Sequence, residues 1–290
     1  MSTIRKLVRI DTPKGQPGFL GPGHTARPVL SGDFSATDPF IMLMDDMLDK
    51  KDNIPVGGPH PHAGFETVSL LLEGEIGDDA HKMKSGDFQI MTAGSGIVHT
   101  ETIDKATRLH LLQLWLNLPK KSRWAVPRVQ DLPSEHVPVS SKNGVSIRLY
   151  SGSLAGLNSP IQNHTPFILA DVNINANVKT VLEIPGNYNT FLYVLSGVVK
   201  VGEPAKQLSQ DQVGWLDLSD DEQQSELVLT TGKDDVRLVL YGGKPTGENI
   251  VSYGPFIADS SEDIQRLYRE YRQGKMEHIS KVSPGQRLLY

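Results

Sequence analysis

A strand-turn-strand pattern occurs twice in this sequence, once in each half. In the first half, Glu66–Gly74 (ETVSLLLEG) is followed thirteen residues later by Asp87. In the second half, Thr190–Gly197 (TFLYVLSG) is followed fourteen residues later by Asp211. Chance similarity of two hairpins is the alternative, but strand, glycine turn, strand, acidic turn and strand recur in the same order. We therefore expect two tandem copies of one antiparallel β unit, each closed into a barrel or sandwich that protects its edges.

Short apolar segments separated by glycine and proline run along the chain, a rhythm typical of strands joined by turns. The 27 glycines and 19 prolines cluster between these segments. The predicted fold class is therefore mostly all-β. The expected strands are Phe40–Met44, Glu66–Leu72, Phe88–Met91, Arg108–Leu118, Ser146–Tyr150, Phe167–Val172, Thr190–Leu195, Val213–Leu218 and Val236–Tyr241.

Two other segments punctuate this pattern. The stretch 119–143 carries four prolines and several charges, which is typical of a surface linker. We expect the domain boundary there, with an N-terminal barrel over residues 1–135 and a C-terminal barrel over residues 136–290. Near the C-terminus, apolar residues recur at helical spacing from Ile264 to Tyr271, between a capping serine at 260 or 261 and Gly274. This pattern predicts a helix that ends the second domain.

Composition excludes several functional classes. The formal net charge is −5 and lysine and arginine are scattered, so direct nucleic-acid binding is not expected. No apolar run approaches the ~20 residues that span a bilayer, and the first ten residues do not resemble a secretory signal. We therefore expect a cytoplasmic protein without a membrane segment. The chain has no cysteine, so any metal must have nitrogen and oxygen ligands.

Histidine and glutamate occur at a spacing that suits a metal site. His60 and His62 directly precede an expected strand, and His99 and Glu101 follow a glycine-rich turn. Side chains at i and i+2 of an extended segment lie on one face, so each pair can converge on a point. A lone His-x-His is often only a surface pair, but the second pair favours a site with three imidazoles and one carboxylate. Such a ligand set suits Fe, Mn, Ni, Cu or Zn.

Other titratable residues are weaker candidates. Glu66 shares the strand parity of His62. It is either a further ligand or, as we favour, a base that contacts the ligands and not the metal. His110 lies on an expected strand and is either a core residue or such a support, and the role of His81 is open. We interpret three further histidines as ordinary polar residues, namely His136, His164 and His278.

Two long stretches resemble the signature motifs of the pirins, a branch of the cupin superfamily. They are GPHPHAGFETV at 58–68 and GDFQIMTAGSGIVHTE at 86–101. The resemblance continues through LQLWLNLP at 112–119 and GNYNTFLY at 186–193 to SYGPF at 252–256. It implies two β-barrels packed face to face, with one iron in the N-terminal barrel. The family's ligand positions match His60, His62, His99 and Glu101, whereas the second barrel has no matching set.

The resemblance also suggests an activity. Some pirins share the quercetin 2,3-dioxygenase reaction, in which O₂ opens the heterocycle of a flavonol with loss of carbon monoxide. We therefore expect one divalent metal, Fe²⁺ first, with Glu101 as ligand and candidate proton acceptor. A flat aromatic substrate would contact apolar wall residues, for which the candidates are Phe40, Met42, Phe65, Met91 and Ile97. In pirins the loop between the residues that match Gly74 and Gly86 is usually longer, which makes substrate choice less predictable.

Two alternative functions remain open from sequence. Other pirins regulate transcription or metabolic enzymes, so the chain could be an iron-dependent binding protein that acts through a protein partner. A metal-free scaffold is the second alternative. Because one chain already carries two barrels, we expect a monomer.

Overall fold

The computed structural model of the 290-residue chain describes residues 3–77, 82–219 and 222–290. Its contacts form two compact units. Lys14–His136 joins with Thr246–Tyr290, and we call this unit the N-terminal barrel. Val137–Pro245 joins with Met1–Pro13 in the unit that we call the C-terminal barrel. Each terminal segment thus belongs to the unit built mainly from the other half of the sequence.

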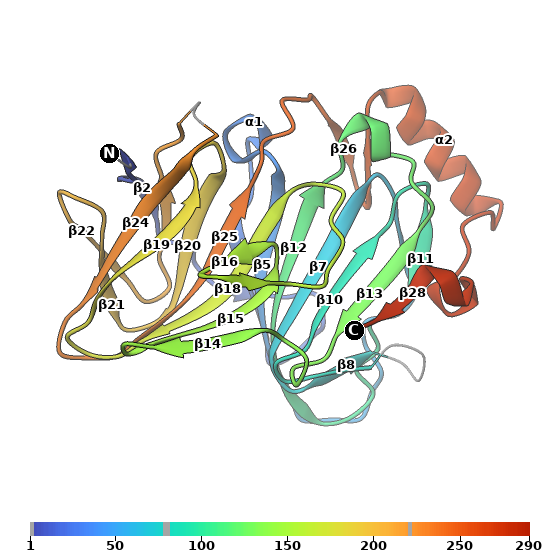
Figure 1. Cartoon of the computed structure of the whole chain (residues 1–290). Coiled ribbons are helices and arrows are strands. Elements are labelled where there is room, and N and C mark those ends of the chain that lie inside the picture. The colour runs from blue at the N-terminus through green and yellow to red at the C-terminus, as the bar shows by residue number, and fades with distance from the viewer. Residues whose placement is uncertain (1–2, 78–81, 220–221) are drawn as a thin grey trace. The chain divides into compact units, whose positions relative to one another are not determined.

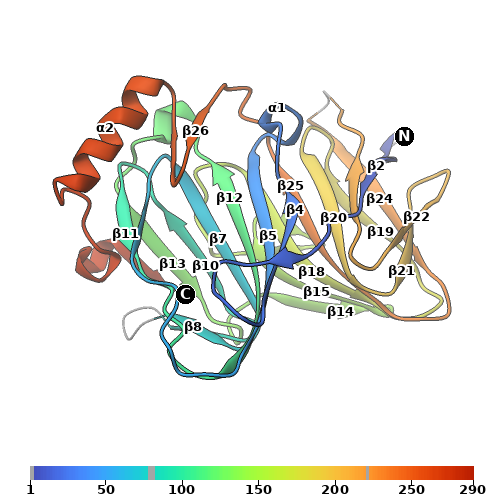
Figure 2. The same cartoon turned by 180° about the vertical axis from the view of Figure 1, so that it is seen from behind.

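An eight-stranded sheet forms the main wall of the N-terminal barrel (Figures 1 and 2). Neighbouring strands pair antiparallel, except for the first two of the series, which are parallel. The order is β28 (Arg287–Leu289), β13 (Arg128–Leu132), β10 (Phe88–Thr92), β7 (Phe65–Glu73), β12 (Thr107–Asn117), β5 (Phe40–Lys50), β4 (His24–Leu30) and β3 (Gln16–Pro17).

Smaller elements complete the N-terminal barrel. Its two-stranded ladders pair β6 (His60–His62) with β11 (Ile97–His99), β8 (Glu75–Gly77) with β9 (Lys82–Lys84), and β26 (Val251–Tyr253) with β27 (Phe256–Ala258). Its helices are α1 (Phe34–Thr37) and α2 (Ser261–Arg272), with 3₁₀ turns η1 (Lys120–Ser122), η2 (Ile279–Lys281) and η3 (Pro284–Gln286).

The C-terminal barrel contains a seven-stranded and a five-stranded sheet. The seven-stranded order is β14 (Val139–Lys142), β15 (Val145–Ser151), β18 (Phe167–Ile174), β25 (Val236–Gly243), β20 (Asn189–Ser196), β23 (Val213–Leu216) and β2 (Leu7–Asp11). The five-stranded sheet contains β1 (Thr3–Ile4), β24 (Gln224–Thr231), β21 (Val198–Val201) and β22 (Lys206–Ser209), with β19 (Lys179–Pro185) paired to β24. A short hairpin joins β16 (Ser153–Leu154) to β17 (Leu157–Asn158).

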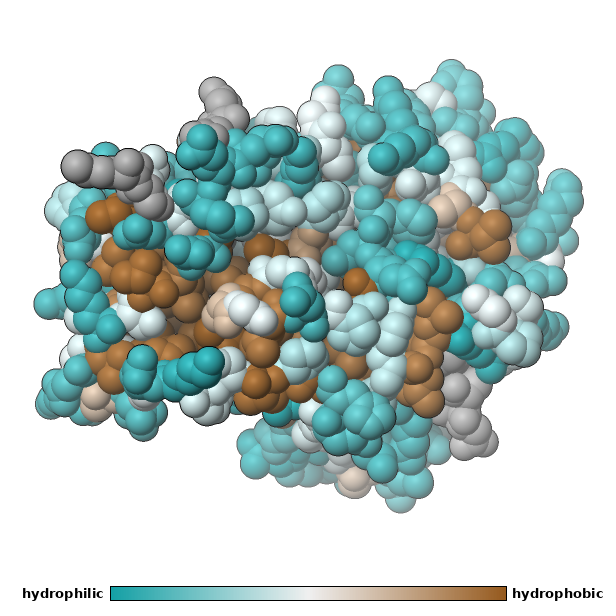
Figure 3. All heavy atoms as spheres, in the orientation of Figure 1, coloured by the Kyte–Doolittle hydropathy of each residue, from teal (hydrophilic) through white to brown (hydrophobic). Residues whose placement is uncertain are grey.

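One apolar cluster fills the interior of the C-terminal barrel. It takes side chains from both sheets, for example Leu192 and Leu240 from one and Leu182 and Leu229 from the other. The face drawn in Figure 3 also carries a patch of apolar residues over this barrel. Burial of both sheets against one core explains why alternating apolar residues form these strands.

The predicted mostly-β fold class is confirmed, and each of the nine expected strands is present, as β5, β7, β10, β12, β15, β18, β20, β23 and β25. The C-terminal helix is also confirmed as α2. The hydroxyl of Ser260 accepts a hydrogen bond from the backbone N–H of Asp263, while Ile264 and Leu267 are buried. Gly274, with φ of +68°, follows the end of the helix.

Two details differ from the sequence prediction. The middle of the expected linker 119–143 forms β13, whose Val129 and Leu132 are fully buried, so the interpretation of this stretch as a linker is wrong there. The charged residues of this stretch made a strand look unfavourable. In the fold, Asp131 is accommodated because it lies opposite Gln89 and accepts a hydrogen bond from its side-chain amide. The helix α2, expected in the C-terminal domain, groups with the N-terminal barrel because it packs on β27.

Among the described residues, no helix is both long enough and apolar enough to cross a membrane.

Candidate metal centre

A short antiparallel ladder brings the two histidine motifs together. In the pairing of β6 with β11, His60 lies opposite His99 and His62 lies opposite Ile97. The ladder continues on its outer side, where Val98 forms a parallel bridge to His278. Cross-strand neighbours in such a ladder lie about 4.5–5.5 Å apart at Cβ, which is close enough for their imidazole nitrogens to bind one metal ion. The register of two short strands therefore builds the site.

The three imidazoles of His60, His62 and His99 converge. Their ligand nitrogens all lie within 4.8 Å of one another. The Nε2 atoms of His60 and His99 are 2.8 Å apart, and the ring of His62 lies 4.9 and 5.0 Å from the other two. Three imidazole nitrogens aimed at one point form a donor set that suits a transition metal.

The protonation of the rings also fits metal binding, which requires neutral imidazole. Burial lowers the pKa of His99 to about 3, with further lowering from the charges of His60 and His278. Burial also lowers the pKa of His62 well below 6.5, assisted by His99 and His60. The Nδ1 of His60 lies 2.9 Å from the carbonyl oxygen of Gly58. A neutral His60 donates from that nitrogen, so its lone pair lies on Nε2, the atom that faces Nε2 of His99.

Glu101 lies beside the histidine triad. Its Oε2 is 3.9 Å from Nε2 of His60. The other oxygen, Oε1, accepts a 2.7 Å hydrogen bond from the side-chain amide of Gln113 on β12. Burial raises the pKa of the Glu101 carboxyl, while the charge of His60 and the Gln113 bond oppose that rise. The carboxyl group is therefore held through Oε1 by Gln113, while Oε2 lies on the side of His60.

A buried arginine supports the turn that follows the histidine pair. Arg123, fully buried, donates from Nη1 to the carbonyl of Gly64 at 2.9 Å and to the side chain of Asn117. Its Nε also donates to Asp259 at 3.2 Å. Gly64 has φ of +85°, and a Cβ there would lie only 1.9 Å from the carbonyl oxygen of Ile257, so glycine is required. The turn is thus fixed from two sides.

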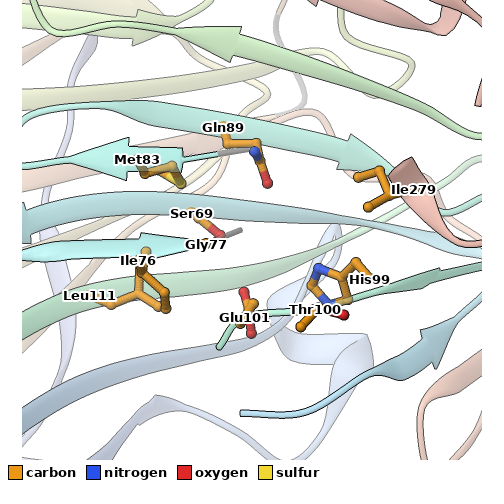
Figure 4. A pocket seen from close by; sticks show the side chains of 10 residues that line it. All are labelled: Ser69, Ile76, Gly77, Met83, Gln89, His99, Thr100, Glu101, Leu111 and Ile279. Atoms are coloured by element: carbon orange, nitrogen blue, oxygen red, sulfur yellow. The ribbon is translucent and has the colours of Figure 1, made fainter. Parts of the chain in front are cut away.

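A small pocket borders the triad (Figure 4). The space open to the centre of a water molecule is about 20 Å³, which is room for one or two waters. The lining residues are Ser69, Ile76, Gly77, Met83, Gln89, His99, Thr100, Glu101, Leu111 and Ile279.

Glu66 is fully buried, and one of its carboxyl oxygens is hydrogen-bonded to a side chain of β10. Its Oε1 accepts a 2.7 Å hydrogen bond from the hydroxyl of Thr92. Burial raises its pKa to about 7, and this rise is opposed by the Thr92 bond and by the charge of Arg128. Within the described residues, Oε2 has no hydrogen-bond partner. A role of Glu66 at the metal stays a prediction.

The predicted wall residues do not line this pocket. Phe65 lies 5.2 Å from the ring of His62 and 4.3 Å from that of Trp115. Met91 and Ile97 belong to an apolar cluster with Ile279. The other two, Met42 and Phe40, lie on β5. Met42 is opposite Trp115 in the sheet. Phe40 is opposite Leu116 and is fully buried.

The other histidines have separate roles. His110 Nε2 lies 2.7 Å from Asp45, and His136 Nδ1 lies 2.6 Å from the carbonyl oxygen of Tyr290. His278 is interpreted from sequence as an ordinary polar residue. Its Nε2 lies 2.9 Å from the hydroxyl of Thr100, the residue between the predicted ligands His99 and Glu101 in the sequence. His81 lies outside the described residues.

Sequence reasoning also missed Gln113, Trp115 and Ser69. The strand parity of 111, 113 and 115 could have indicated that Gln113 and Trp115 share a face.

Family models match both barrels. The Pirin model matches residues 24–116, and the model of the Pirin C-terminal cupin domain matches residues 169–277. The chain belongs to the pirin family. Pirin from Rattus norvegicus is 35% identical over 267 residues, covering 88% of each chain.

Solved structures agree with this pirin fold. A quercetin 2,3-dioxygenase from Acinetobacter baumannii matches with a TM-score of 0.83 at 24% identity, covering 96% of this chain and 100% of the other. The bacterial pirin YhhW from Escherichia coli, in complex with nickel(II), matches with a TM-score of 0.62 at 20% identity, covering 84% and 100%. At these identities, the likeness shows the two-barrel fold.

Proposed function

We propose that this pirin is a metal-dependent dioxygenase with one divalent ion held by His60, His62, His99 and Glu101. The observation that carries the proposal is the convergence of three imidazoles, each of which offers one ring nitrogen within 4.8 Å of those of the other two. Iron is the first candidate from the family resemblance. Nickel gains support from the nickel-bound pirin of Escherichia coli, and manganese, copper and zinc suit the same donors.

A bound transition metal would act as a Lewis acid toward a substrate oxygen and offer an open position to O₂. The protein residues have other tasks. Burial keeps His62 and His99 neutral, so their nitrogens stay available as ligands at physiological pH. Gln113 holds Oε1 of Glu101, which leaves Oε2 able to accept the proton of a substrate hydroxyl. The raised pKa of Glu101 improves it as a proton acceptor near neutral pH.

We propose a flavonol-like aromatic substrate. The name of the Acinetobacter baumannii neighbour and the resemblance to pirins with this activity suggest it. The pocket beside the triad has room for one or two waters, so it can take only one end of such a molecule. A more open groove of about 450 Å³ shares Ile76 and Gly77 with the pocket and could take the rest.

Metal analysis followed by an aerobic assay tests the proposal. Protein purified without added metal is expected to contain about one transition metal per chain, and to consume quercetin with release of carbon monoxide. His60→Ala is expected to lose the metal, and Glu101→Ala is expected to lose turnover. His136→Ala serves as the matched control, because the ring of His136 lies against the carbonyl oxygen of Tyr290. This variant is expected to keep both the metal and the turnover.

A protein-binding function is the second candidate, and the small size of the pocket favours it. In that case the fully loaded protein would leave quercetin intact at the background rate. A metal-dependent protein partner would then be retained in pull-downs by the wild type and lost with His60→Ala. Protein without stoichiometric metal would contradict both candidates.

A further inference from the structure

A polar row crosses the interior wall of the N-terminal barrel. Gln89 on β10 lies opposite Ser69 on β7, and Ser69 lies opposite Gln113 on β12. Residues directly opposite in a sheet have their side chains on the same face. The next positions on that face toward β8 and β9 are the apolar pair Leu71 and Leu111. Three polar side chains in register therefore interrupt an apolar wall.

Two members of this row have partners within the protein. The side-chain amide of Gln113 donates to Glu101 at 2.7 Å. The side-chain amide of Gln89 donates to Oδ1 of Asp131, also at 2.7 Å. That bond fixes the orientation of Gln89 while its carbonyl oxygen and second N–H are not used by it.

Ser69 differs from both glutamines. Ser69 as a residue is only 5% exposed, and no hydrogen bond of its hydroxyl occurs within the described residues, 3–77, 82–219 and 222–290. It lines the pocket beside His99 and Glu101. Figure 4 shows the polar ends of Ser69 and Gln89 directed to the side of the pocket where Glu101 lies.

A hydroxyl without a protein partner costs free energy unless something in the pocket bonds to it. Valine or alanine would satisfy this strand position without that cost. The pocket has room for one or two waters, so the partner of Ser69 must be a water or a small part of a ligand.

We infer that Ser69, with Gln89 beside it, forms a subsite for an oxygen atom of a ligand bound at the histidine triad. The inference deepens the proposed function and rests on it. The ligand class is a compact carbonyl, carboxylate or phenolate oxygen, because Ser69 and Gln89 are neutral groups that both donate and accept hydrogen bonds. Ile76, Leu111 and Met83 line the same pocket and favour an apolar frame around that oxygen.

The subsite makes Ser69 a residue that determines specificity, because an analogue without an oxygen at this position loses one hydrogen bond. A neutral hydrogen bond of this kind corresponds to a change in affinity of about ten-fold. The triad is not touched by the substitution, so metal affinity is expected to stay unchanged.

Binding to nickel-loaded protein without O₂ tests the inference independently of turnover. Two probes are titrated by calorimetry: quercetin as the extended ligand and acetate as the small one. The proteins are the wild type, Ser69→Ala and, as a matched control, Ser225→Ala, whose buried hydroxyl already donates to the carbonyl of Ile184. Ser69→Ala is expected to lower the affinity for whichever probe binds by about ten-fold. The control variant is expected to bind it with wild-type affinity.

The outcomes separate the subsite from the proposed activity. If Ser69→Ala binds both probes as tightly as the wild type, the subsite is wrong, whatever the turnover of quercetin. If acetate alone binds and is weakened in Ser69→Ala, the subsite stands and the flavonol proposal fails. If neither probe binds to the wild type, the pocket takes no ligand of this class and the inference is overturned.

Discussion

The interiors of the two barrels can be compared row by row, because the glycine turns at Gly74 and Gly197 align β7 with β20. Leu71 and Leu111 of the N-terminal barrel then correspond to Val194 and Leu238, an apolar pair in both units. The next row differs. Gln89, Ser69 and Gln113 correspond to Gly214, Leu192 and Leu240, which lie opposite one another in the same register.

This difference shows how one strand pattern supports two interiors. In the C-terminal barrel, Leu192 and Leu240 are part of a single apolar cluster. In the N-terminal barrel, the polar row and the histidine triad separate smaller apolar clusters, one around Leu71 and another around Met91. A barrel can thus exchange a continuous core for a polar site by changing one row, while its hydrogen-bonded frame stays the same.

Buried arginines give the largest expected effects in this comparison. Arg123 supports Gly64 in the N-terminal barrel, and Arg5 donates to the carbonyls of Pro185, Gly186 and Tyr188 in the C-terminal barrel. Arg123→Met removes the hydrogen bonds to Gly64, Asn117 and Asp259 and is expected to cost about 3–5 kcal/mol of unfolding free energy. Urea denaturation measures this cost.

The same pair of variants separates the two barrels by function. Arg123→Met is expected to weaken metal binding at least about ten-fold, because Gly64 lies only two residues after His62. Arg5→Met is expected to destabilise the protein as well, but to leave metal affinity unchanged. Equal metal affinities of the two folded variants would contradict the assigned role of Arg123.

The next largest expected effect is on the pH dependence of stability and comes from the carboxyl of Glu66. The corresponding residue of the C-terminal barrel is the neutral Asn189. Burial raises the pKa of Glu66 from 4.5 to about 7 in the folded protein. Its contribution to stability is therefore complete below pH 4.5 and is lost as the pH rises through 7. Glu66→Gln is expected to raise the unfolding free energy of metal-free protein by up to about 3 kcal/mol at pH 8.

Denaturation curves between pH 4.5 and 8 measure this effect of Glu66. The difference between wild type and Glu66→Gln is expected to approach zero at the acidic end of the range. A constant difference at every pH would show that Glu66 is not protonated in the fold near neutral pH.

The sequence predicts the triad better than its surroundings. His60, His62 and His99 follow from the alternation of side chains on extended segments, which is a local property. Their convergence depends on the pairing of β6 with β11, which the alternation within each segment does not determine. The ligand role itself stays a prediction until metal is measured.

The remaining features depend on long-range register, which a single sequence does not encode. Ser69 looks like any residue of an apolar strand until Gln89 and Gln113 are found opposite it. The hydrogen bond between His278 and Thr100 joins residues 178 positions apart and requires the docking of the C-terminal segment. Arg123 was hidden in a stretch whose prolines and charges resemble a linker.

Gln113→Leu converts one position of the polar row to its counterpart Leu240. The substitution removes the hydrogen bond to Glu101 and leaves the three histidines in place. Outer groups that orient metal ligands typically contribute about 10–100-fold to affinity, so nickel binding is expected to weaken about ten-fold. Gln89→Leu, in the same row but bonded to Asp131, is the control and is expected to retain wild-type nickel affinity. Equal loss in both variants would indicate general damage to the barrel.

The smallest expected effect compares two buried serines. Ser225 donates its hydroxyl to the carbonyl of Ile184 at 2.9 Å, so Ser225→Ala is expected to cost about 1 kcal/mol of unfolding free energy. The hydroxyl of Ser69 has no such bond within the described residues, so Ser69→Ala is expected to change stability by less than about 0.5 kcal/mol. Urea denaturation without ligand measures both. A cost at Ser69 equal to that at Ser225 would mean that its hydroxyl is satisfied inside the fold, and would remove the reason to assign it to a ligand.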